Sequence, residues 1–231
     1  MHVVHWHLLN HTHATPHTIT RMLGLLAATL VLAAAPPADA GFDGSSHPIK
    51  GKVRERVVGS SWHRGCPVGL GKLRLLRVDH YGFDGEVHRG RLIVHARHDE
   101  RILRVFKRLY RLQFPIRRME LIDRYGANDR RSMAADNTSA FNCRVVAGTN
   151  RWSMHAYGKA IDLNPIENPY VSGSHVSPPA GEPYADRSRD AKGMVHRGDA
   201  VVKAFAAVGW KWGGAWPGGT KDYQHFSANG R

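Results

Sequence analysis

Two short segments in the C-terminal half of the chain contain the residues best suited to chemistry. The first carries His155 and Asp162, seven positions apart with glycine and small residues between them, and the second carries Asp222 and His225. A catalytic zinc usually takes three nitrogen, oxygen or sulfur ligands from the protein and keeps a fourth position open. The pattern therefore predicts a zinc site with His155, Asp162 and His225 as ligands. Asp222 is the candidate general base that activates water.

Residues around these segments have types that suit the support of such a site. Ser153 and Tyr157 are candidate hydrogen-bond donors that would orient the metal ligands. Three tryptophans, Trp210, Trp212 and Trp216, would wall the site and exclude water. Taken singly, a histidine is more often a hydrogen-bonded structural residue and an aspartate more often a turn residue. The combination of both segments favours the chemical interpretation.

The composition bounds the size of the protein and the kind of partner it meets. A chain of 231 residues is long enough to bury a core and fits one domain. Its 33 Lys and Arg against 19 Asp and Glu give a net charge of +14, which favours anionic partners. The charge is spread along the chain and no nucleic-acid-binding module is visible. We therefore expect anionic polymers of a cell envelope, and not nucleic acid, among the partners.

The first 40 residues have the features of an export signal. An apolar stretch at residues 22–35 follows Arg21, and Ala38-Asp39-Ala40 has the A-x-A pattern that signal peptidases cleave. We predict that residues 1–40 are an N-terminal extension with a signal peptide, and that the mature protein is secreted without a stable membrane span. An uncleaved membrane anchor is the alternative.

Export makes the two cysteines, Cys66 and Cys143, candidates for one disulfide. Free cysteines are also common as small buried apolar residues. The sequence alone leaves both interpretations open, because it does not show whether the two Cα atoms lie close enough to bridge.

Hydrophobic patterns predict strands and helices after a flexible lead-in at residues 41–60. Apolar residues at three- and four-residue steps predict a helix over residues 99–114, with Asp99 as its N-cap. A second helix is expected over residues 198–208, and a long surface loop over the Pro-, Gly- and Ser-rich residues 166–193. Strands are predicted over residues 73–78, 91–95, 116–125, 141–148 and 160–163, with a final strand or turn after Trp210. This order indicates an α+β fold in a single small domain, residues 61–231, with a central antiparallel sheet and flanking helices.

Four motifs together resemble a known family. They are Phe-Asn-Cys-Arg ending at Arg144, Ser-x-His-x-x-Gly-x-Ala-x-Asp-x-Asn-Pro from Ser153, Trp-x-Trp-Gly-Gly-x-Trp from Trp210, and Asp-x-x-His-Phe from Asp222. The combination resembles the VanY-type D-alanyl-D-alanine carboxypeptidase family of zinc peptidases, in particular its branch with L-alanyl-D-glutamate endopeptidases. The resemblance covers residues 62–226. It implies a Hedgehog/DD-peptidase-like fold, one Zn2+ per chain and peptidoglycan stem peptide as the substrate class.

By position, the resemblance implies the same three ligands and the same base, and it adds Arg144. The family's arginine polarises the scissile carbonyl or holds a substrate carboxylate, tasks that suit a guanidinium with its fork of donors. A structural ion pair is the alternative role for Arg144. Many members have glutamate where Asp222 stands, so backbone placement must make up the reach of the shorter side chain.

Other hydrolase patterns are absent from the sequence. It contains no His-Glu-x-x-His, no Ser-x-x-Lys and no Gly-x-Ser-x-Gly, which argues against thermolysin-like enzymes, penicillin-binding serine enzymes and α/β-hydrolases. We therefore expect a secreted, monomeric zinc peptidase that hydrolyses peptidoglycan stem peptides, with the bond it cuts left open.

Two other kinds of protein are alternatives. A non-catalytic cell-wall-binding domain would keep the fold but be free to lose Asp222. Metal storage or envelope tethering through the basic charge and the N-terminal histidines is the third interpretation.

Overall fold

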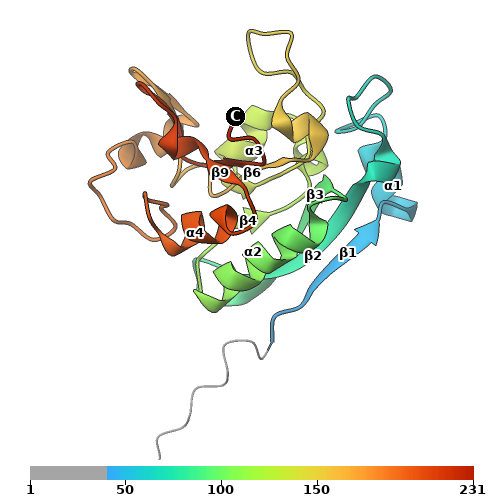
Figure 1. Ribbon diagram of the computed structural model, residues 1–231, viewed down its shortest axis with the longest axis horizontal. Coiled ribbons are helices and arrows are strands. Elements are labelled where there is room, and N and C mark those ends of the chain that lie inside the picture. Colours follow the sequence, from blue (N-terminus) through green and yellow to red (C-terminus); the bar gives the residue numbers. More distant parts are fainter. Residues whose placement is uncertain (1–40) are drawn as a thin grey trace, which may run out of the picture. The chain divides into compact units, whose positions relative to one another are not determined.

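The computed structural model describes residues 41–231 (Figure 1). The predicted N-terminal extension and signal peptide, residues 1–40, lie outside the described residues. Within the described part of the chain, no helix is long and apolar enough to cross a membrane.

An antiparallel sheet in the order β1-β2-β3 forms one layer of the fold. Its strands are β1 (Gly44–Pro48), β2 (Leu73–Tyr81) and β3 (Val87–His95). The strands predicted at residues 73–78 and 91–95 are confirmed, and both are longer than their apolar patterns indicated. The additional residues include Asp79 and His80 on β2, which pair with Arg89 and His88 on β3, and these polar pairs have no apolar pattern that would predict a strand.

Helix α2 (Asp99–Arg111) packs on this sheet and confirms the helix predicted from apolar spacing. Its buried residues are Ile102, Leu103, Val105, Phe106, Leu109 and Tyr110. The helix ends before the predicted position because Gln113 adopts a left-handed φ of 49°. The prediction of Asp99 as the N-cap was wrong: His98 is the N-cap, and Asp99 is the first helical residue. Its carboxylate accepts a hydrogen bond from Ser46 Oγ at 2.7 Å, which links α2 to β1.

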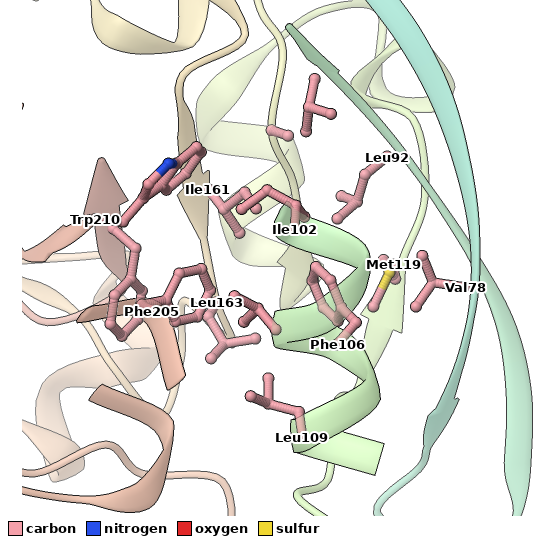
Figure 2. Close-up of a cluster of buried hydrophobic side chains, with 14 of the residues drawn as sticks. Val78, Leu92, Ile102, Phe106, Leu109, Met119, Ile161, Leu163, Phe205 and Trp210 are labelled. Atoms are coloured by element: carbon pink, nitrogen blue, oxygen red, sulfur yellow. The ribbon is translucent and has the colours of Figure 1, made fainter. Parts of the chain in front are cut away.

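A second antiparallel sheet, in the order β6-β11-β9, lies on the other side of α2. Its strands are β6 (Ala160–Asp162), β11 (His225–Ser227) and β9 (Lys211–Trp212). Helix α4 (Ala200–Ala206) packs nearby, with the Phe205 ring stacked on Phe226 at 3.9 Å between centroids. Figure 2 shows α2 between Val78, Leu92 and Met119 on one side and Ile161, Leu163 and Phe205 on the other. The main core thus joins the two halves of the chain.

The remaining elements are short. Strands β7 (Tyr170–Ser172), β8 (His175–Ser177) and β10 (Thr220–Asp222) form a third antiparallel sheet, and β4 (Arg118–Met119) pairs in parallel with β5 (Asn137–Thr138). The other helices are α1 (Gly51–Val57) and α3 (Asp129–Ala134). The 3-10 turns are η1 (Leu70–Lys72), η2 (Ile122–Tyr125), η3 (Met154–Tyr157), η4 (Pro179–Tyr184) and η5 (Gly213–Ala215). The α+β class is confirmed, but several small sheets replace the single central sheet that we predicted.

Four local predictions were wrong. Residues 41–60 are not an irregular lead-in, because they form α1 and β1, and β1 pairs with β2 along its whole length. The strand predicted at 116–125 is reduced to β4, and the one at 141–148 is replaced by irregular chain. Residues 166–193 are more than a surface loop, since they hold β7, β8 and η4 and bury Glu167 and Asn168. Sequence patterns missed these elements because polar edge strands and buried irregular segments show no periodic spacing of apolar residues.

Cys66 and Cys143 form a disulfide, with their Cα atoms 5.8 Å apart. The structure therefore decides between the two interpretations that the sequence left open. The bond ties the chain ahead of β2 to a segment 77 positions later, just before Arg144. His63 lies close to both sulfurs, but sulfurs joined in a disulfide lack the thiolate that binds metal.

Replacing both cysteines with serine should lower the free energy of unfolding by about 2–4 kcal/mol, because the cross-link restricts the unfolded chain. Denaturant unfolding of the wild-type protein and the double variant measures this difference. Wild-type protein treated with a reductant is the control and should match the variant. An unchanged midpoint in the double variant would show that the disulfide contributes no stability.

Candidate active site

Three buried side chains converge as the residue spacing predicted. His155 Nε2 lies 3.1 Å from Asp162 Oδ2, and His225 Nδ1 lies 3.0 Å from Asp162 Oδ1. The two imidazole nitrogens are 3.3 Å apart. All three residues are buried: His155 is 3% exposed, Asp162 is 5% exposed and His225 is 6% exposed. The structure thus brings together the predicted ligands, which come from positions far apart in the chain.

Local structure explains how these side chains meet. In the β6–β11 pair, His225 lies directly opposite Asp162, so both side chains project from the same face. His155 comes from η3, where Ser153 Oγ accepts a hydrogen bond from the His155 backbone N–H at 3.2 Å. Gly158 ends η3 with a φ of 64°, and a Cβ there would lie 2.7 Å from the backbone nitrogen of His95. Glycine is therefore required between the histidine and the strand that carries Asp162.

Main-chain oxygens determine which nitrogen of each histidine carries a proton. His155 Nδ1 lies 2.5 Å from the Ala140 carbonyl oxygen, and His225 Nε2 lies 3.2 Å from the main-chain oxygen of Arg231. Because these oxygens only accept, each of those nitrogens must donate an N–H. The opposite nitrogens, His155 Nε2 and His225 Nδ1, face Asp162 with their lone pairs available. Such an arrangement is typical of histidines that bind metal, whose second nitrogen donates to a carbonyl or carboxylate.

The donor spacing fits a tetrahedral zinc. Zinc bonds of about 2.0–2.1 Å at tetrahedral angles separate neighbouring ligand atoms by about 3.3 Å. The two imidazole nitrogens are 3.3 Å apart, and each lies 3.0–3.1 Å from a different oxygen of Asp162. Two neutral nitrogens and one carboxylate oxygen are also the donor types that zinc prefers. His155, Asp162 and His225 would therefore hold the ion without rearrangement of the backbone.

The electrostatics of the three residues also favour a cation between them. Burial alone would raise the pKa of Asp162, but the two histidines outweigh it and hold that pKa well below its usual range. Burial alone would lower the pKa of His225, but hydrogen bonding to Asp162 and the charge of that carboxylate raise it to about 9. A buried carboxylate thus demands a positive partner, which is either a proton on imidazole or a metal ion.

Asp222 lies on β10 beside these residues and lines the same cleft. Its Oδ1 is buried and has no hydrogen-bond partner among the described residues. Burial, opposed by the nearby His225 charge, raises the pKa of Asp222 to about 6. Gly213 permits this placement, because a Cβ there would lie 2.4 Å from the Asp222 carbonyl oxygen. An unpaired carboxylate in the cleft is what a general base requires.

The site opens into a cleft of about 730 Å³. Its lining residues are Arg144, Val146, Arg151, Trp152, Ser153, Met154, His155, Asp162, Tyr170, Trp216, Asp222, His225, Asn229 and Arg231. Arg144 lines this cleft and also makes the structural ion pair that was its alternative role. Its Nη2 pairs with Asp129 Oδ2 at 2.8 Å, and its buried Nε has no partner among the described residues.

Some predicted supporting residues lie elsewhere or act differently. Ser153 orients His155 as an acceptor for its backbone and not as a donor to its ring. Tyr157 does not line the cleft, and the Lys159 ammonium lies 5.6 Å from its ring centroid. Trp210 and Trp212 are core residues, so only Trp216 walls the site, with its ring centroid 5.9 Å from that of His225. Trp216 differs from the two core tryptophans because the chain turns at η5, which separates Trp212 from Trp216.

Sequence reasoning missed one side of the cleft. Val146, Arg151 and Trp152 lie on a short hairpin that leads into Ser153, and Tyr170 comes from β7. The turn at Gly148 and the position of Arg151-Trp152 directly before the motif were the available signals. The Ala140 carbonyl that orients His155 has no signal in the sequence, because it is a main-chain atom.

Arg187 braces the long segment that borders the site. Its guanidinium lies 4.4 Å from the ring centroid of Tyr223, the neighbour of Asp222. It also donates hydrogen bonds of 2.7–3.2 Å to four oxygens. These are the side-chain Oδ1 of Asn168 and the main-chain oxygens of Glu167, Tyr184 and Val195. One side chain therefore links the region after β6 to the strand that carries the base.

Glu167 in this region is a buried acid whose environment disfavours its charge. Burial and the adjacent Asp136 raise the pKa of Glu167 to about 8 from an ordinary value of 4.5. Arg117, at 3.4 Å from both carboxylates, offsets only part of this effect. The native state thus holds a proton that the unfolded chain releases between about pH 4.5 and 8.

Stability of the wild-type protein should therefore fall as pH rises through this window. Glu167→Gln, which stays neutral, should be more stable than wild type by about 1–3 kcal/mol at pH 8 and equal to it at pH 4.5. Denaturant unfolding at the two pH values gives the comparison. Glu182→Gln, which removes an exposed carboxylate from the same region, should show no such difference. A variant no more stable than wild type at pH 8 would contradict the argument.

Comparison with known proteins identifies one similarity. A family model described as D-alanyl-D-alanine carboxypeptidase matches residues 147–228. No curated protein and no solved structure matches the chain. The matched stretch contains His155, Asp162, Asp222 and His225, whereas Arg144 precedes it. The match supports the coarser part of the predicted resemblance, to D-alanyl-D-alanine carboxypeptidases, over residues 147–228, and the buried His-Asp-His group is consistent with a metal site.

Proposed function

We propose that the protein is a secreted zinc peptidase that hydrolyses peptidoglycan stem peptides. The observation that carries this proposal is the presence in one cleft of the buried His155–Asp162–His225 group and of Asp222, whose Oδ1 is unpaired. The match to the D-alanyl-D-alanine carboxypeptidase model over residues 147–228 supports the reaction and the substrate class. The presence of Asp222 as a candidate base argues against a non-catalytic domain that only binds the cell wall.

Each residue has a role that follows from its position. When bound, zinc supplies Lewis-acid chemistry, because it polarises a carbonyl oxygen and lowers the pKa of a water molecule toward ~7. Asp222 takes the proton of the attacking water and passes it to the nitrogen of the leaving amine as the peptide C–N bond breaks. Ser153 and the Ala140 carbonyl keep the His155 ring in its orientation throughout.

Arg144 is proposed to steady negative charge on the substrate. Asp129 occupies only its Nη2, so the other terminal nitrogen, Nη1, remains available to a substrate in the cleft that Arg144 lines. The ion pair fixes the guanidinium plane in advance, which reduces the entropy lost when the substrate binds. The scissile carbonyl oxygen and a substrate carboxylate are the two groups that it suits.

The location and the assembly follow the same proposal. The Cys66–Cys143 disulfide supports an extracytoplasmic site of action, in keeping with the signal peptide predicted at residues 1–40. The net charge of +14 suits a protein that stays close to anionic polymers of the cell envelope. We propose a monomer that holds one zinc ion per chain.

Mass spectrometry of peptidoglycan fragments tests this function. The purified, zinc-loaded protein is incubated with the fragments, with and without a chelator. Loss of a terminal D-alanine that the chelator abolishes would establish a carboxypeptidase, and cleavage between L-alanine and D-glutamate would establish an endopeptidase. No product from folded, zinc-loaded protein would overturn the proposal and favour the wall-binding domain.

A further inference from the structure

A hairpin at residues 144–153 forms one wall of the cleft. Val146 N–H donates to Arg151 O at 2.8 Å, and Ser153 N–H donates to Arg144 O at 3.1 Å. Val145 and Trp152 form the bridge between these two pairs. In Figure 1 the hairpin is drawn in yellow and extends outward from the body of the fold. Its base carries Ser153, which orients the metal ligand His155.

The pairing decides which side chains face the substrate. Successive residues of a strand project to opposite faces, so the pairs Arg144/Ser153 and Val146/Arg151 share one face and Val145/Trp152 share the other. All four residues of the first face line the cleft; of the second face, Trp152 also borders it and Val145 does not. Arg151 therefore lies one step farther out than Ser153 on the cleft side, and its Cα is about 7 Å from that of Ser153 by the usual strand rise.

Arg151 differs from the other arginine on this face in having a free charge. Arg144 is neutralised by Asp129 at 2.8 Å. Arg151 is exposed, and its guanidinium makes no ion pair or hydrogen bond within residues 41–231. Its backbone is nevertheless held in place, because its N–H donates to Thr149 Oγ1 at 3.2 Å and its carbonyl accepts from Val146. The charge is thus positioned without a partner among the described residues.

We infer that Arg151 binds a carboxylate of the substrate peptide and so restricts the enzyme to peptides that carry a free carboxylate near the scissile bond. This inference rests on the proposed function and deepens it. Arg151 lines the same cleft as the three candidate metal ligands and Asp222, and it precedes His155 by only four positions, so a carboxylate bound to it lies close to the bond that is cut. A guanidinium binds a carboxylate in bidentate geometry, which an amide does not reproduce.

A stem pentapeptide with L-lysine at its third position offers two such groups, the terminal carboxylate of the last D-alanine and the α-carboxylate of the γ-linked D-glutamate. The experiment uses this peptide and two analogues, one with a terminal carboxamide and one with D-isoglutamine in place of D-glutamate. KM and kcat are measured for the zinc-loaded wild-type protein and for Arg151→Gln. Calorimetry gives the dissociation constants of the same peptides, a measurement that does not depend on turnover.

For wild type, one amide analogue should bind about ten-fold more weakly than the parent peptide. Arg151→Gln should bind the parent peptide about ten-fold more weakly, with kcat within about two-fold, and should bind that analogue as wild type does. The analogue that shows this pattern identifies the carboxylate. Arg104→Gln, which removes an exposed arginine of α2, is the matched control and should behave as wild type.

Equal losses for all three peptides, or no loss for any, would overturn the inference. If wild type cleaves every peptide and Arg151→Gln is unaffected, the inference fails and the proposed function stands. If wild type cleaves none, the proposed function fails, and the dissociation constants still decide whether Arg151 binds a carboxylate.

Discussion

Replacing Asp222 with asparagine should lower kcat by about 10³-fold while one zinc ion per chain stays bound. The amide has the size of the carboxylate but cannot accept the proton of the attacking water. The three metal ligands do not include Asp222, and its Oδ1 makes no hydrogen bond within the described chain that the substitution would break. The measurement is steady-state hydrolysis of a stem peptide, with zinc content determined on the same samples.

Two further variants separate a chemical role from a structural one. Asp222→Glu keeps the carboxylate and should retain part of the activity, since glutamate is common at this position in the family that the sequence resembles. Asp190→Asn removes an exposed carboxylate of the same charge and should leave kcat unchanged. Full turnover by the zinc-loaded Asp222→Asn variant would exclude Asp222 as the base.

Replacing Asp162 with asparagine should abolish stoichiometric zinc binding and should therefore lower the activity at least 10³-fold. Asp162 contributes the anionic ligand, and its two oxygens contact both histidines at 3.0 and 3.1 Å. The amide preserves the shape of the side chain but removes the charge that makes the buried site attractive to a divalent cation. Zinc content after dialysis, measured by elemental analysis, gives the first result.

Thermal unfolding supplies a second measurement that is independent of catalysis. A ligand that binds only the folded state stabilises it by about 4 kcal/mol at a thousand-fold excess over its dissociation constant. Zinc should therefore raise the Tm of the wild-type protein and leave that of Asp162→Asn unchanged. Asp186→Asn, at an exposed position, should respond to zinc as wild type does. A zinc-dependent rise in the Tm of Asp162→Asn would contradict the assignment of this ligand.

The residues of the candidate site were predictable because their types and order are unusual. His155, Asp162, Asp222 and His225 were chosen from the sequence, and the structure places the donor atoms of the three candidate ligands within 4.8 Å of one another. Arg144 was predicted from the resemblance and lines the same cleft. Imidazole and carboxylate groups are rarely buried together without a function, so a pattern that would gather them is informative in the sequence itself.

Supporting residues were predicted less well, because their roles depend on direction. Trp210, Trp212 and Trp216 are alike in the sequence, yet only Trp216 faces the cleft. Tyr157 is two positions from His155 and still lies outside the cleft, since η3 rotates successive side chains away from one another. The spacing of residues in the sequence does not show which side chains of a short irregular element point into the cleft.

Secondary-structure elements with long apolar patterns were predicted from the sequence, whereas short elements were not. Helix α2 was predictable because its apolar stripe repeats over thirteen residues from Asp99 to Arg111. β1 was missed because an edge strand needs only backbone hydrogen bonds, and its sequence Gly-Ser-Ser-His-Pro contains no alternation. Strands of two or three residues, such as β6 and β9, are too short to show a period at all.

The sequence by itself indicated the chemistry that we propose for this protein, because the donor types and their order along the chain imply a metal and a base without reference to shape. It also determined the α+β class and the helix at the centre of the core. Only the tertiary structure decided that Cys66 meets Cys143, that the Ala140 carbonyl orients His155, and that Arg151 faces the cleft unpaired. These features depend on distances between segments far apart in the chain and on main-chain atoms, which every residue carries and no sequence pattern distinguishes.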